Sequence, residues 1–529
     1  MDPAVIQEVE SLSRLRAVDE AAERGDSLIQ DFYKDAVVFV TGGSGFLGKH
    51  LIEKLFRSCD IKRVYMLVRQ KKGQIPQDRL SKIFKDALFD TLRKRKPDFE
   101  ERVHAVQGDV TQVQLGISDE DWQLLTNEVT VVFHVAATVA FDEPLRVAVN
   151  TNVRGTMQAL RLGQECRHLK SFVHVSTAYS HALPNRIGGY VNEDFYDSPA
   201  NPSTIVDLVQ QLSEEKLAAI KPELIKDWPN TYAYTKALAE EVVRTMSGDL
   251  PICIVRPAIV VASNLEPSPG WMDISSVYGP SGILLGVGLG VMHTFMANND
   301  TYIDLIPVDI VNNGTIAAGW ETARRHAAGD RDVKIYTCTT TRNPKNNPLW
   351  LVVDIMYNES MNYATPKAVW YSFHVHTKFR WVFLLLTWLL HYIPGYLADG
   401  VLTVLGKKPK IIKIYDLAYK LSVLLSYYTC NEFYFKDDNL RNLYNSLSET
   451  DKDMYNFDIE KMVWREQLVL WSIGLRKYII KDGLKDTRKA VMWQRVARFL
   501  NYFVLALYFY GLYCLFSFTV WAARWIVGY

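Results

Sequence analysis

The chain has 529 residues, which is enough for more than one domain. Its 60 lysines and arginines nearly balance its 59 aspartates and glutamates, so the charge favours no nucleic-acid partner. The six cysteines form no CxxC pair and no metal-ligand spacing, so the sequence predicts no disulfide framework, no metal site and a reducing compartment.

Residues 1–30 are charged and mildly amphipathic. This composition predicts a polar, partly helical extension and no signal peptide.

The stretch Val37–Leu51 passes from a β-branched apolar run through glycines into a helical pattern. Glycines permit a sharp turn and a close approach to a phosphate, and the helix start offers free N–H groups and a positive dipole end to a pyrophosphate. The pattern TGxxGxxG resembles the extended short-chain dehydrogenase/reductase family. The cofactor-binding residues predicted in this turn are Thr41, Gly42, Ser44, Gly45, Phe46, Leu47 and Gly48.

The second predicted strand, residues 63–68, is followed by basic residues. A strand that serves NAD usually ends in an acid for the ribose, whereas this one ends in Arg69, with Lys71 and Lys72 after it. Cations at this position suit a 2′-phosphate, so we expect NADPH as the cofactor. The alternative is a solvated basic loop.

Strands are also predicted over residues 103–107, 129–135 and 252–261. The family resemblance implies that Asp109 and Val110 contact the adenine and that Pro257 flanks the nicotinamide. Ala136 is small enough for the backbone to lie against the cofactor. Asn152, on the next helix, either braces the active site or packs the helix.

The fifth predicted strand, residues 171–177, ends in hydroxyl side chains, where ligands bind in parallel sheets. Farther along, Tyr232 and Lys236 share one helix face. A free tyrosine has a pKa near ~10, and an ammonium group one turn away is expected to lower it. Tyr232 is then the proton donor, Lys236 also holds the nicotinamide ribose, and Thr177 polarises the substrate carbonyl, with Ser176 as the second choice.

Seven motifs in order narrow the resemblance: TGGSGFLG, VRQKKG, HVSTAY, YAYTK, VRPAIV, EPSPGW and IDLIPVD. Together they resemble the alcohol-forming fatty acyl-CoA reductases, most closely the insect members, from about residue 31 to 485. The resemblance implies that a first hydride gives a hemithioacetal, which loses CoA to leave an aldehyde, and that a second NADPH gives the primary alcohol. One departure is that Leu289 and His293 stand where the family usually has a lysine and an arginine that could meet CoA phosphates.

The last third of the chain is rich in aromatic and apolar residues. Residues 381–390 are apolar all round but too short to span a bilayer, which leaves a buried or interfacial helix near the acyl chain, or ordinary core. Residues 499–523 carry no charge and are long enough to cross the membrane as a helix. Arg488, Lys489, Arg495 and Arg498 precede this span, so the catalytic region is expected on the cytosolic side.

We therefore expect an α/β fold: a Rossmann-like, doubly wound parallel sheet, a helical C-terminal domain and one C-terminal transmembrane helix. The expected parts are an extension (1–30), an NADPH-binding reductase domain with its substrate-binding part (31–340), an apolar linker (341–410), a helical domain (411–490) and the membrane helix (499–523). The expected substrate is a long-chain acyl-CoA, and the expected site is the endoplasmic reticulum or peroxisomal membrane. The alternatives are a membrane-bound hydroxysteroid-type dehydrogenase and an inactive lipid-binding scaffold.

Overall fold

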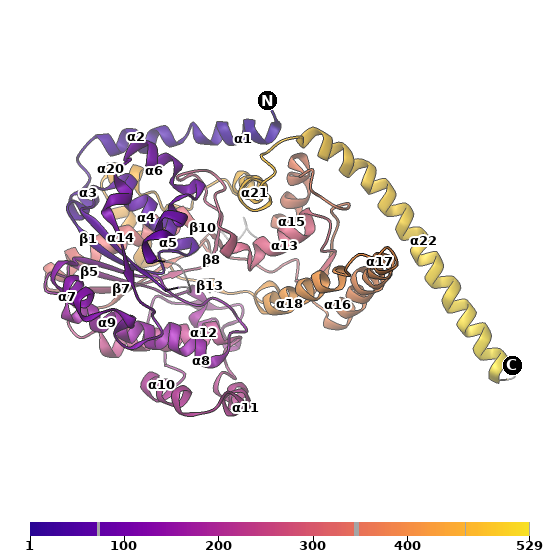
Figure 1. Cartoon of the computed structure of the whole chain (residues 1–529), viewed down its shortest axis with the longest axis horizontal. Coiled ribbons are helices and arrows are strands. Elements are labelled where there is room, and N and C mark those ends of the chain that lie inside the picture. Colours follow the sequence, from indigo (N-terminus) through magenta and orange to yellow (C-terminus); the bar gives the residue numbers. More distant parts are fainter. Residues whose placement is uncertain (71–74, 343–348, 461, 528–529) are drawn as a thin grey trace.

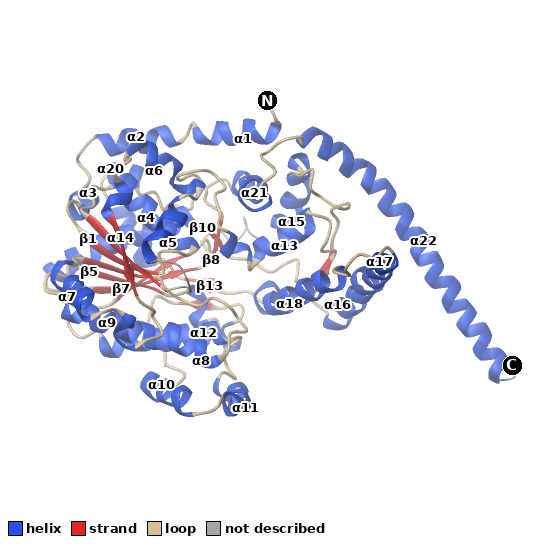
Figure 2. Ribbon diagram, viewed as in Figure 1, coloured by secondary structure: helices blue, strands red, loops and turns tan. Residues whose placement is uncertain are grey.

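A central parallel sheet with helices on both faces dominates the computed structural model, and a helical region extends to one side of it (Figure 2). The structure describes the chain except residues 71–74, 343–348, 461 and 528–529. The sheet has seven strands in the order β11-β7-β5-β4-β1-β2-β3. These strands are β1 Val37–Thr41, β2 Arg63–Val68, β3 Val103–Gln107, β4 Val131–His134, β5 Ser171–Val175, β7 Ile252–Pro257 and β11 Lys334–Cys338.

The sheet is doubly wound because its strands are apolar on both sides. All five residues of β1 are buried, so each face of the sheet needs a cover of helices. One core lies beneath α3 Leu28–Tyr33, α4 Phe46–Ser58 and α14 Val308–Ala327. The opposite core lies beneath α7 Asp119–Glu128, α9 Gly155–Glu165 and α12 Thr231–Met246 (Figure 1). The predicted fold class is confirmed.

The strand order reverses between β1 and β4, which are neighbours in the sheet. In open sheets of this type, ligands bind beyond the carboxyl ends of the strands at such a point. The topology therefore places the site at the residues that follow β1 and β4, with β5 and α12 beside them.

The single strand predicted over residues 252–261 is wrong in one respect. The structure divides it into β7, in the central sheet, and β8 Ile259–Val261, which pairs with β10 Leu305–Pro307 in a separate two-stranded sheet. Pro257 ends β7, and proline has no N–H with which to continue a ladder of hydrogen bonds.

The C-terminal region is mostly helical and packs around its own core. Two further strand pairs join it to the rest of the molecule, namely β12 Val375–Thr377 with β9 Thr294–Met296, and β13 Tyr434–Phe435 with β6 Tyr190–Val191. Helix α13 Pro280–Gly288 precedes this region. The helices of the region are α15 Leu349–Asn358, α16 Arg380–Thr387, α17 Ile393–Val404, α18 Ile411–Cys430, α19 Asp438–Ser446, α20 Glu449–Met454 and α21 Trp464–Gly474.

A buried carboxylate in the EPSPGW motif ties α4 to this region. The Nζ atom of Lys54 lies 2.5 Å from Oε2 of Glu266 and donates to the carbonyl oxygen of Met454, at the end of α20. Arg57 donates to the same carboxylate oxygen, at 2.8 Å. Loss of either partner would leave an unpaired charge in the interior, which is costly. The motif therefore fixes α4, and with it the glycine turn, against the C-terminal helices.

The N-terminal helices meet the start of the last helix at the side of the C-terminal region: Asp2 accepts the backbone N–H of Thr487 at 3.0 Å. Helices α1 Pro3–Leu12 and α2 Leu15–Glu23 run along one edge, and α22 Thr487–Val527 begins beside α1 and then projects away from the molecule (Figure 1). Only the first part of α22 is packed: Trp370 donates from Nε1 to Oδ1 of Asn501 at 2.8 Å, and Gln494 accepts from the backbone N–H of Ser372. The apolar remainder of α22 is exposed.

Candidate active site

The turn between β1 and α4 is built as a dinucleotide cradle. Gly42 has φ +76°, and a Cβ there would lie 2.6 Å from the backbone N of Ala136. A Cβ on Gly48 would lie 2.3 Å from the carbonyl oxygen of Gly42, so only glycine lets α4 start this close to the strand. Gly45 caps α4 without any side-chain hydrogen bond, which leaves the first N–H groups, at Phe46 and Leu47, for an anion. Ser44 is exposed in the same turn. These residues fit a pyrophosphate.

A side-chain network fixes the two strand ends on either side of this cradle. Thr41, the last residue of β1, lies 2.8 Å through Oγ1 from Nδ1 of His134, the last residue of β4. The Thr41 oxygen also accepts the backbone N–H of Ala136 at 3.3 Å. Burial lowers the pKa of His134 to about 3, so this histidine is a neutral structural link.

The residues predicted to recognise the adenosine end of the cofactor lie along the same sheet edge. Arg69 follows β2 and its side chain is exposed, while its carbonyl oxygen accepts a hydrogen bond from Arg79. Asp109 follows β3 and accepts from the N–H and Oγ1 of Thr111. Val110 is buried. Lys71 and Lys72 lie outside the described residues.

The Thr177 side chain lies beside the Tyr232 hydroxyl and lowers its pKa. Thr177 also donates from Oγ1 to the carbonyl oxygen of Pro257, at 3.4 Å, at the end of β7. The ring of Tyr232 stacks on Phe141 with centroids 6.1 Å apart. Burial raises the pKa of Tyr232 to about 12, and the neighbouring Thr177 side chain opposes part of this rise.

Lys236 lies one helical turn after Tyr232, as predicted, but its local role differs from the expectation. Its Nζ donates to the carbonyl oxygen of Val175 at 2.7 Å, and the pKa of Tyr232 is raised, not lowered. Burial lowers the pKa of Lys236 to about 8, while Glu240 acts in the opposite direction. Burial is the largest influence on both groups, and the spacing of Tyr232 and Lys236 carries no information about it.

Asn152 braces the site, one of the two roles that the sequence left open. Its Oδ1 accepts the backbone N–H of Thr138 at 2.9 Å, and its Nδ2 donates to Oγ1 of Thr235, next to Lys236, at 2.9 Å. Asn152 lies in a π-helical turn over residues 149–154, a feature frequent at functional sites. This amide joins the chain after β4 to the helix of Tyr232.

Ser176 is engaged away from Tyr232. Its Oγ donates to Oε1 of Glu240 at 2.5 Å. Arg256 also donates to this carboxylate, with Nη2 2.6 Å from Oε2, and His181 lies 3.3 Å from the same oxygen. Burial would raise the pKa of Glu240, but Arg256 and His181 hold it well below its ordinary value. Glu240 is therefore a buried anion that orders the end of β5 beneath Lys236.

The C-terminal helical region reaches the catalytic helix through Tyr428 of α18. Asn230, which caps α12, donates from Nδ2 to the Tyr428 hydroxyl at 2.8 Å and accepts the N–H of Ala233. The Tyr428 ring also lies 5.4 Å from the ring of Phe141, which stacks on Tyr232. The C-terminal region thus contacts both the cap of the helix that carries Tyr232 and the ring that stacks on Tyr232.

The structure shows the surroundings of the two departing residues, Leu289 and His293. The backbone N–H of His293 donates to Nε2 of His391 at 2.8 Å, and its ring stacks on Phe373 at 4.3 Å. Burial lowers the pKa of His293 to about 4, so this position carries no cation near neutral pH. Leu289 is partly exposed, and its carbonyl oxygen accepts from Val369.

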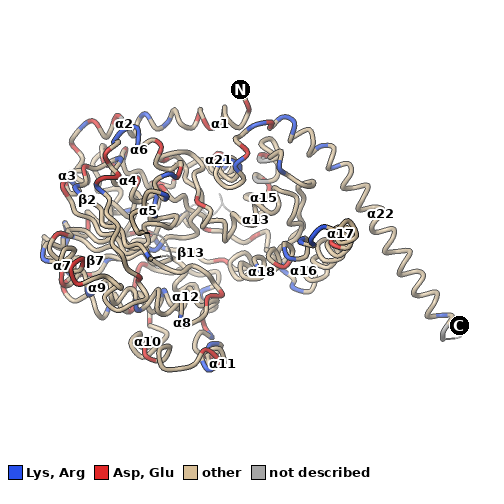
Figure 3. Tube along the Cα trace, in the orientation of Figure 1, with Lys and Arg blue, Asp and Glu red and all other residues tan. Residues whose placement is uncertain are grey.

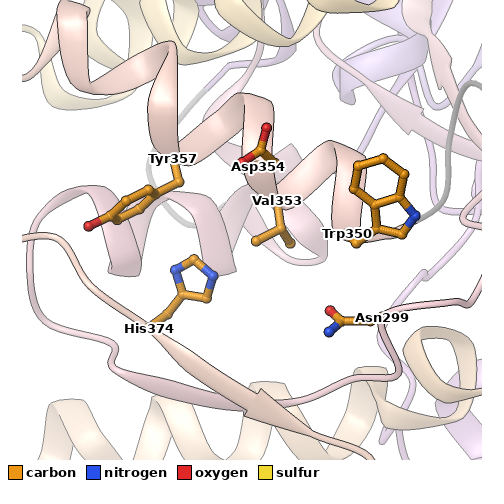
Figure 4. Close-up of a pocket in the computed structure, with 6 residues that line it drawn as sticks. All are labelled: Asn299, Trp350, Val353, Asp354, Tyr357 and His374. Carbon is orange, nitrogen blue, oxygen red and sulfur yellow. The ribbon is translucent and has the colours of Figure 1, made fainter.

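An open pocket of about 470 Å³ lies in the C-terminal region and shares no residue with the predicted site. Figure 4 shows one wall formed by α15, with His374 and Asn299 opposite it. Its lining residues are Asn299, Trp350, Val353, Asp354, Tyr357 and His374.

Sequence reasoning missed Glu240, Arg256, Asn230 and Tyr428. Two local signals were available: Glu240 lies one turn after Lys236 on the same helix face, and an asparagine directly before a helix is a preferred cap. No local signal identifies Tyr428, which is 198 positions from Asn230.

Known proteins resemble this chain in sequence and in fold. A family model of the NAD-binding type, described as male sterility protein, matches residues 40–315, and a second model with the same description matches residues 390–482. The reductase (R) domain of a nonribosomal peptide synthetase from Mycobacterium tuberculosis is similar in fold, with a TM-score of 0.56, 19% identity and coverage of 92% of this chain and 99% of that one. The NAD-binding match and the cradle indicate a nicotinamide dinucleotide cofactor.

Two relatives are similar over nearly the whole chain. Fatty acyl-CoA reductase 1 of Rattus norvegicus is 38% identical over 87% of this chain and 88% of its own length. Fatty acyl-CoA reductase wat of Drosophila melanogaster is 34% identical over 92% of each. The protein therefore belongs to the fatty acyl-CoA reductase family, and it is an oxidoreductase.

Proposed function

We propose that this protein reduces a long-chain fatty acyl-CoA to the primary alcohol, with NADPH as the reductant. The observation that carries the proposal is that Thr177, Tyr232 and Lys236 come together at the carboxyl edge of the sheet, beside a glycine cradle that fits a dinucleotide. The overall change from thioester to alcohol takes up two hydrides and two protons and releases the thiol of CoA.

Thr177, Tyr232 and Lys236 have different roles in this reaction. Thr177 polarises the substrate carbonyl oxygen, and Tyr232 donates its proton to that oxygen as negative charge develops there. With its pKa raised to about 12, Tyr232 holds this proton at neutral pH until the substrate oxygen becomes basic enough to take it. When bound, the nicotinamide supplies the hydride. Lys236, held by Val175 and next to the Asn152 brace, would hold the nicotinamide ribose.

The choice of NADPH over NADH rests on Arg69. Its exposed guanidinium follows β2, where the ribose of a dinucleotide lies in this fold class. A guanidinium binds a phosphate through two parallel hydrogen bonds, so a 2′-phosphate at this place favours NADPH.

We also propose that α22 anchors the protein in a membrane with the catalytic region in the cytosol. Helices Arg380–Val404 and Thr487–Trp525 are long and apolar enough to cross a bilayer, and no residue in the most apolar window of the second is buried. Arg488, Lys489, Arg495 and Arg498 lie at the protein end of α22, which agrees with the positive-inside rule. Protease added to intact microsomes should digest the catalytic region, and its full protection would contradict this orientation.

The activity is tested with the full-length protein, NADPH and palmitoyl-CoA. We expect hexadecanol from the unaltered protein and a loss of turnover of about 10²-fold or more in Tyr232→Phe, as for removal of a general acid. Tyr234→Phe is the matched control, because Tyr234 packs in the core on the same helix. Normal alcohol formation by folded Tyr232→Phe would rule out this site.

A further inference from the structure

Helices α16 and α17 form one continuous helical run, Arg380–Val404, that packs on the molecule along one side only. Its buried positions recur every three or four residues, as on one face of a helix. They are Phe383, Thr387, Leu390, His391, Gly395 and Asp399.

The inward side is fixed to α18 by specific contacts. The ring of His391 stacks on Tyr415 at 4.6 Å. Gly395 lies against the same tyrosine, since a Cβ there would be 2.9 Å from its ring. Asp399 accepts hydrogen bonds from the backbone N–H groups of residues 410, 411 and 412, which holds the turn into α18. The helices therefore cannot roll to bury their outer side.

The outward side is apolar and exposed. Trp381 is 70% exposed and Val404 is 88% exposed, although both are large apolar residues. The residues that share this exposure along the run are Trp381, Leu385, Trp388, Leu397, Val401 and Val404. A row of exposed apolar side chains along one run of helix is typical of a binding surface rather than of ordinary scatter.

Exposed basic residues flank this surface at both ends. Lys378 and Arg380 precede it, and Lys407, Lys408 and Lys410 follow it in the turn before α18. Figure 3 shows these charges at the ends of α16 and α17, near the uncharged length of α22 in that view. Basic residues beside an exposed apolar face are attracted to anionic lipid headgroups.

We propose that the outward face of α16 and α17 lies in the interfacial layer of an anionic bilayer, as a second membrane contact beside α22. The run does not cross the bilayer, because its inner side is buried against α18 and only its outer side is open to lipid. The occupant is a lipid surface rather than a protein partner, because aromatic and aliphatic side chains rimmed by lysines match the layered chemistry of a bilayer surface.

This contact orients the catalytic site relative to the membrane. Helix α18 begins at the basic turn and carries Tyr428 near its other end, where Tyr428 bonds Asn230. A single anchor would let the molecule swing, whereas two contacts fix the direction of the site. The inference depends on the proposed function in one respect only: attachment through α22 holds the chain on the vesicle.

The test uses the full chain in vesicles of phosphatidylcholine and phosphatidylserine, with an apolar photoactivated carbene reagent dissolved in the bilayer. We expect label on the outward residues of α16 and α17 and on α22, and none on the exposed helix α11 Glu214–Leu224. Label on α22 alone would overturn the second contact. Loss of label from α22 would instead refute the anchor.

Charge reversal separates the lipid contact from adventitious labelling. Lys407→Glu with Lys408→Glu should reduce the label on α16 and α17 several-fold and leave α22 unchanged, since each lysine strengthens binding to anionic lipid roughly fivefold. Lys216→Glu with Lys226→Glu, at and after α11, is the matched control and should change nothing. Undiminished label on α16 and α17 in the first variant would overturn the proposal. Absence of label from their outward side in a protein that self-associates would overturn it too.

Discussion

Asn230 and Tyr428 join the two halves of the molecule at the catalytic helix. The Nδ2 atom of Asn230 donates to the Tyr428 hydroxyl at 2.8 Å, two residues before Tyr232. Because Asn230 also caps α12, a change in α18 is transmitted to the start of the catalytic helix.

Tyr428→Phe should therefore lower kcat by roughly tenfold, because a buried donor that loses its partner costs about 1–3 kcal/mol and the start of α12 shifts. Tyr427→Phe is the control: this neighbouring tyrosine donates to the carbonyl oxygen of Ala182 and does not contact Asn230. Steady-state kinetics with palmitoyl-CoA will show whether kcat or KM responds. Equal effects of the two substitutions would mean that the hydrogen bond has no particular role.

Thr177 and Ser176 should respond differently to the same change. Thr177→Ala should reduce kcat by about 10²-fold because the Tyr232 partner is lost, and Thr177→Ser should restore most of it. Ser176→Ala should mainly lower the melting temperature, since the Ser176 hydroxyl bonds buried Glu240. Steady-state kinetics and thermal unfolding of the three variants provide the measurement. A larger loss of kcat in Ser176→Ala than in Thr177→Ala would make Ser176 the hydroxyl that polarises the carbonyl.

The parts of the fold and site that follow from adjacent residues could be predicted from the sequence. The glycine turn after β1 and the spacing of Tyr232 and Lys236 on α12 depend only on local pattern, and the predicted parallel sheet is confirmed. Three other features depend on tertiary packing. They are the break at Pro257, the hydrogen bond from Lys236 to the Val175 carbonyl oxygen, and the approach of Tyr428 to α12. The role of residues 381–390 also needed the structure, because only burial shows that one side of this apolar run is free.

Arg69→Ala should raise the KM for NADPH by about tenfold or more and leave that for NADH nearly unchanged, because a charge-assisted hydrogen bond contributes roughly 1.5–3 kcal/mol. Arg63→Ala is a matched control, since Arg63 starts β2 and pairs with Glu128 at 3.1 Å, at the far end of the strand. Initial rates with each coenzyme provide the measurement. Similar losses with both coenzymes would remove Arg69 from 2′-phosphate recognition.

Cofactor affinity should fall as pH rises through about 8. Burial lowers the pKa of Lys236 to about 8, so its ammonium form is present below this pH and is lost above it. Tyr232, with a pKa of about 12, stays protonated and adds no inflection there. Titration of NADPH fluorescence at several pH values should show the inflection, and Lys236→Arg should abolish it because a guanidinium stays charged. An inflection that persists in Lys236→Arg would assign it to another group.

The stoichiometry of the reaction is the most direct test of the central claim, the conversion of an acyl-CoA to an alcohol at the Tyr232 site. With palmitoyl-CoA and the full chain in lipid vesicles, NADPH oxidation and free CoA thiol are measured together, and the lipid product is identified by mass spectrometry. We expect two NADPH oxidised for each thiol released, with hexadecanol as the product and no turnover above background in Tyr232→Phe. One NADPH for each thiol with hexadecanal as the end product, or no acyl-CoA-dependent oxidation, would contradict the account.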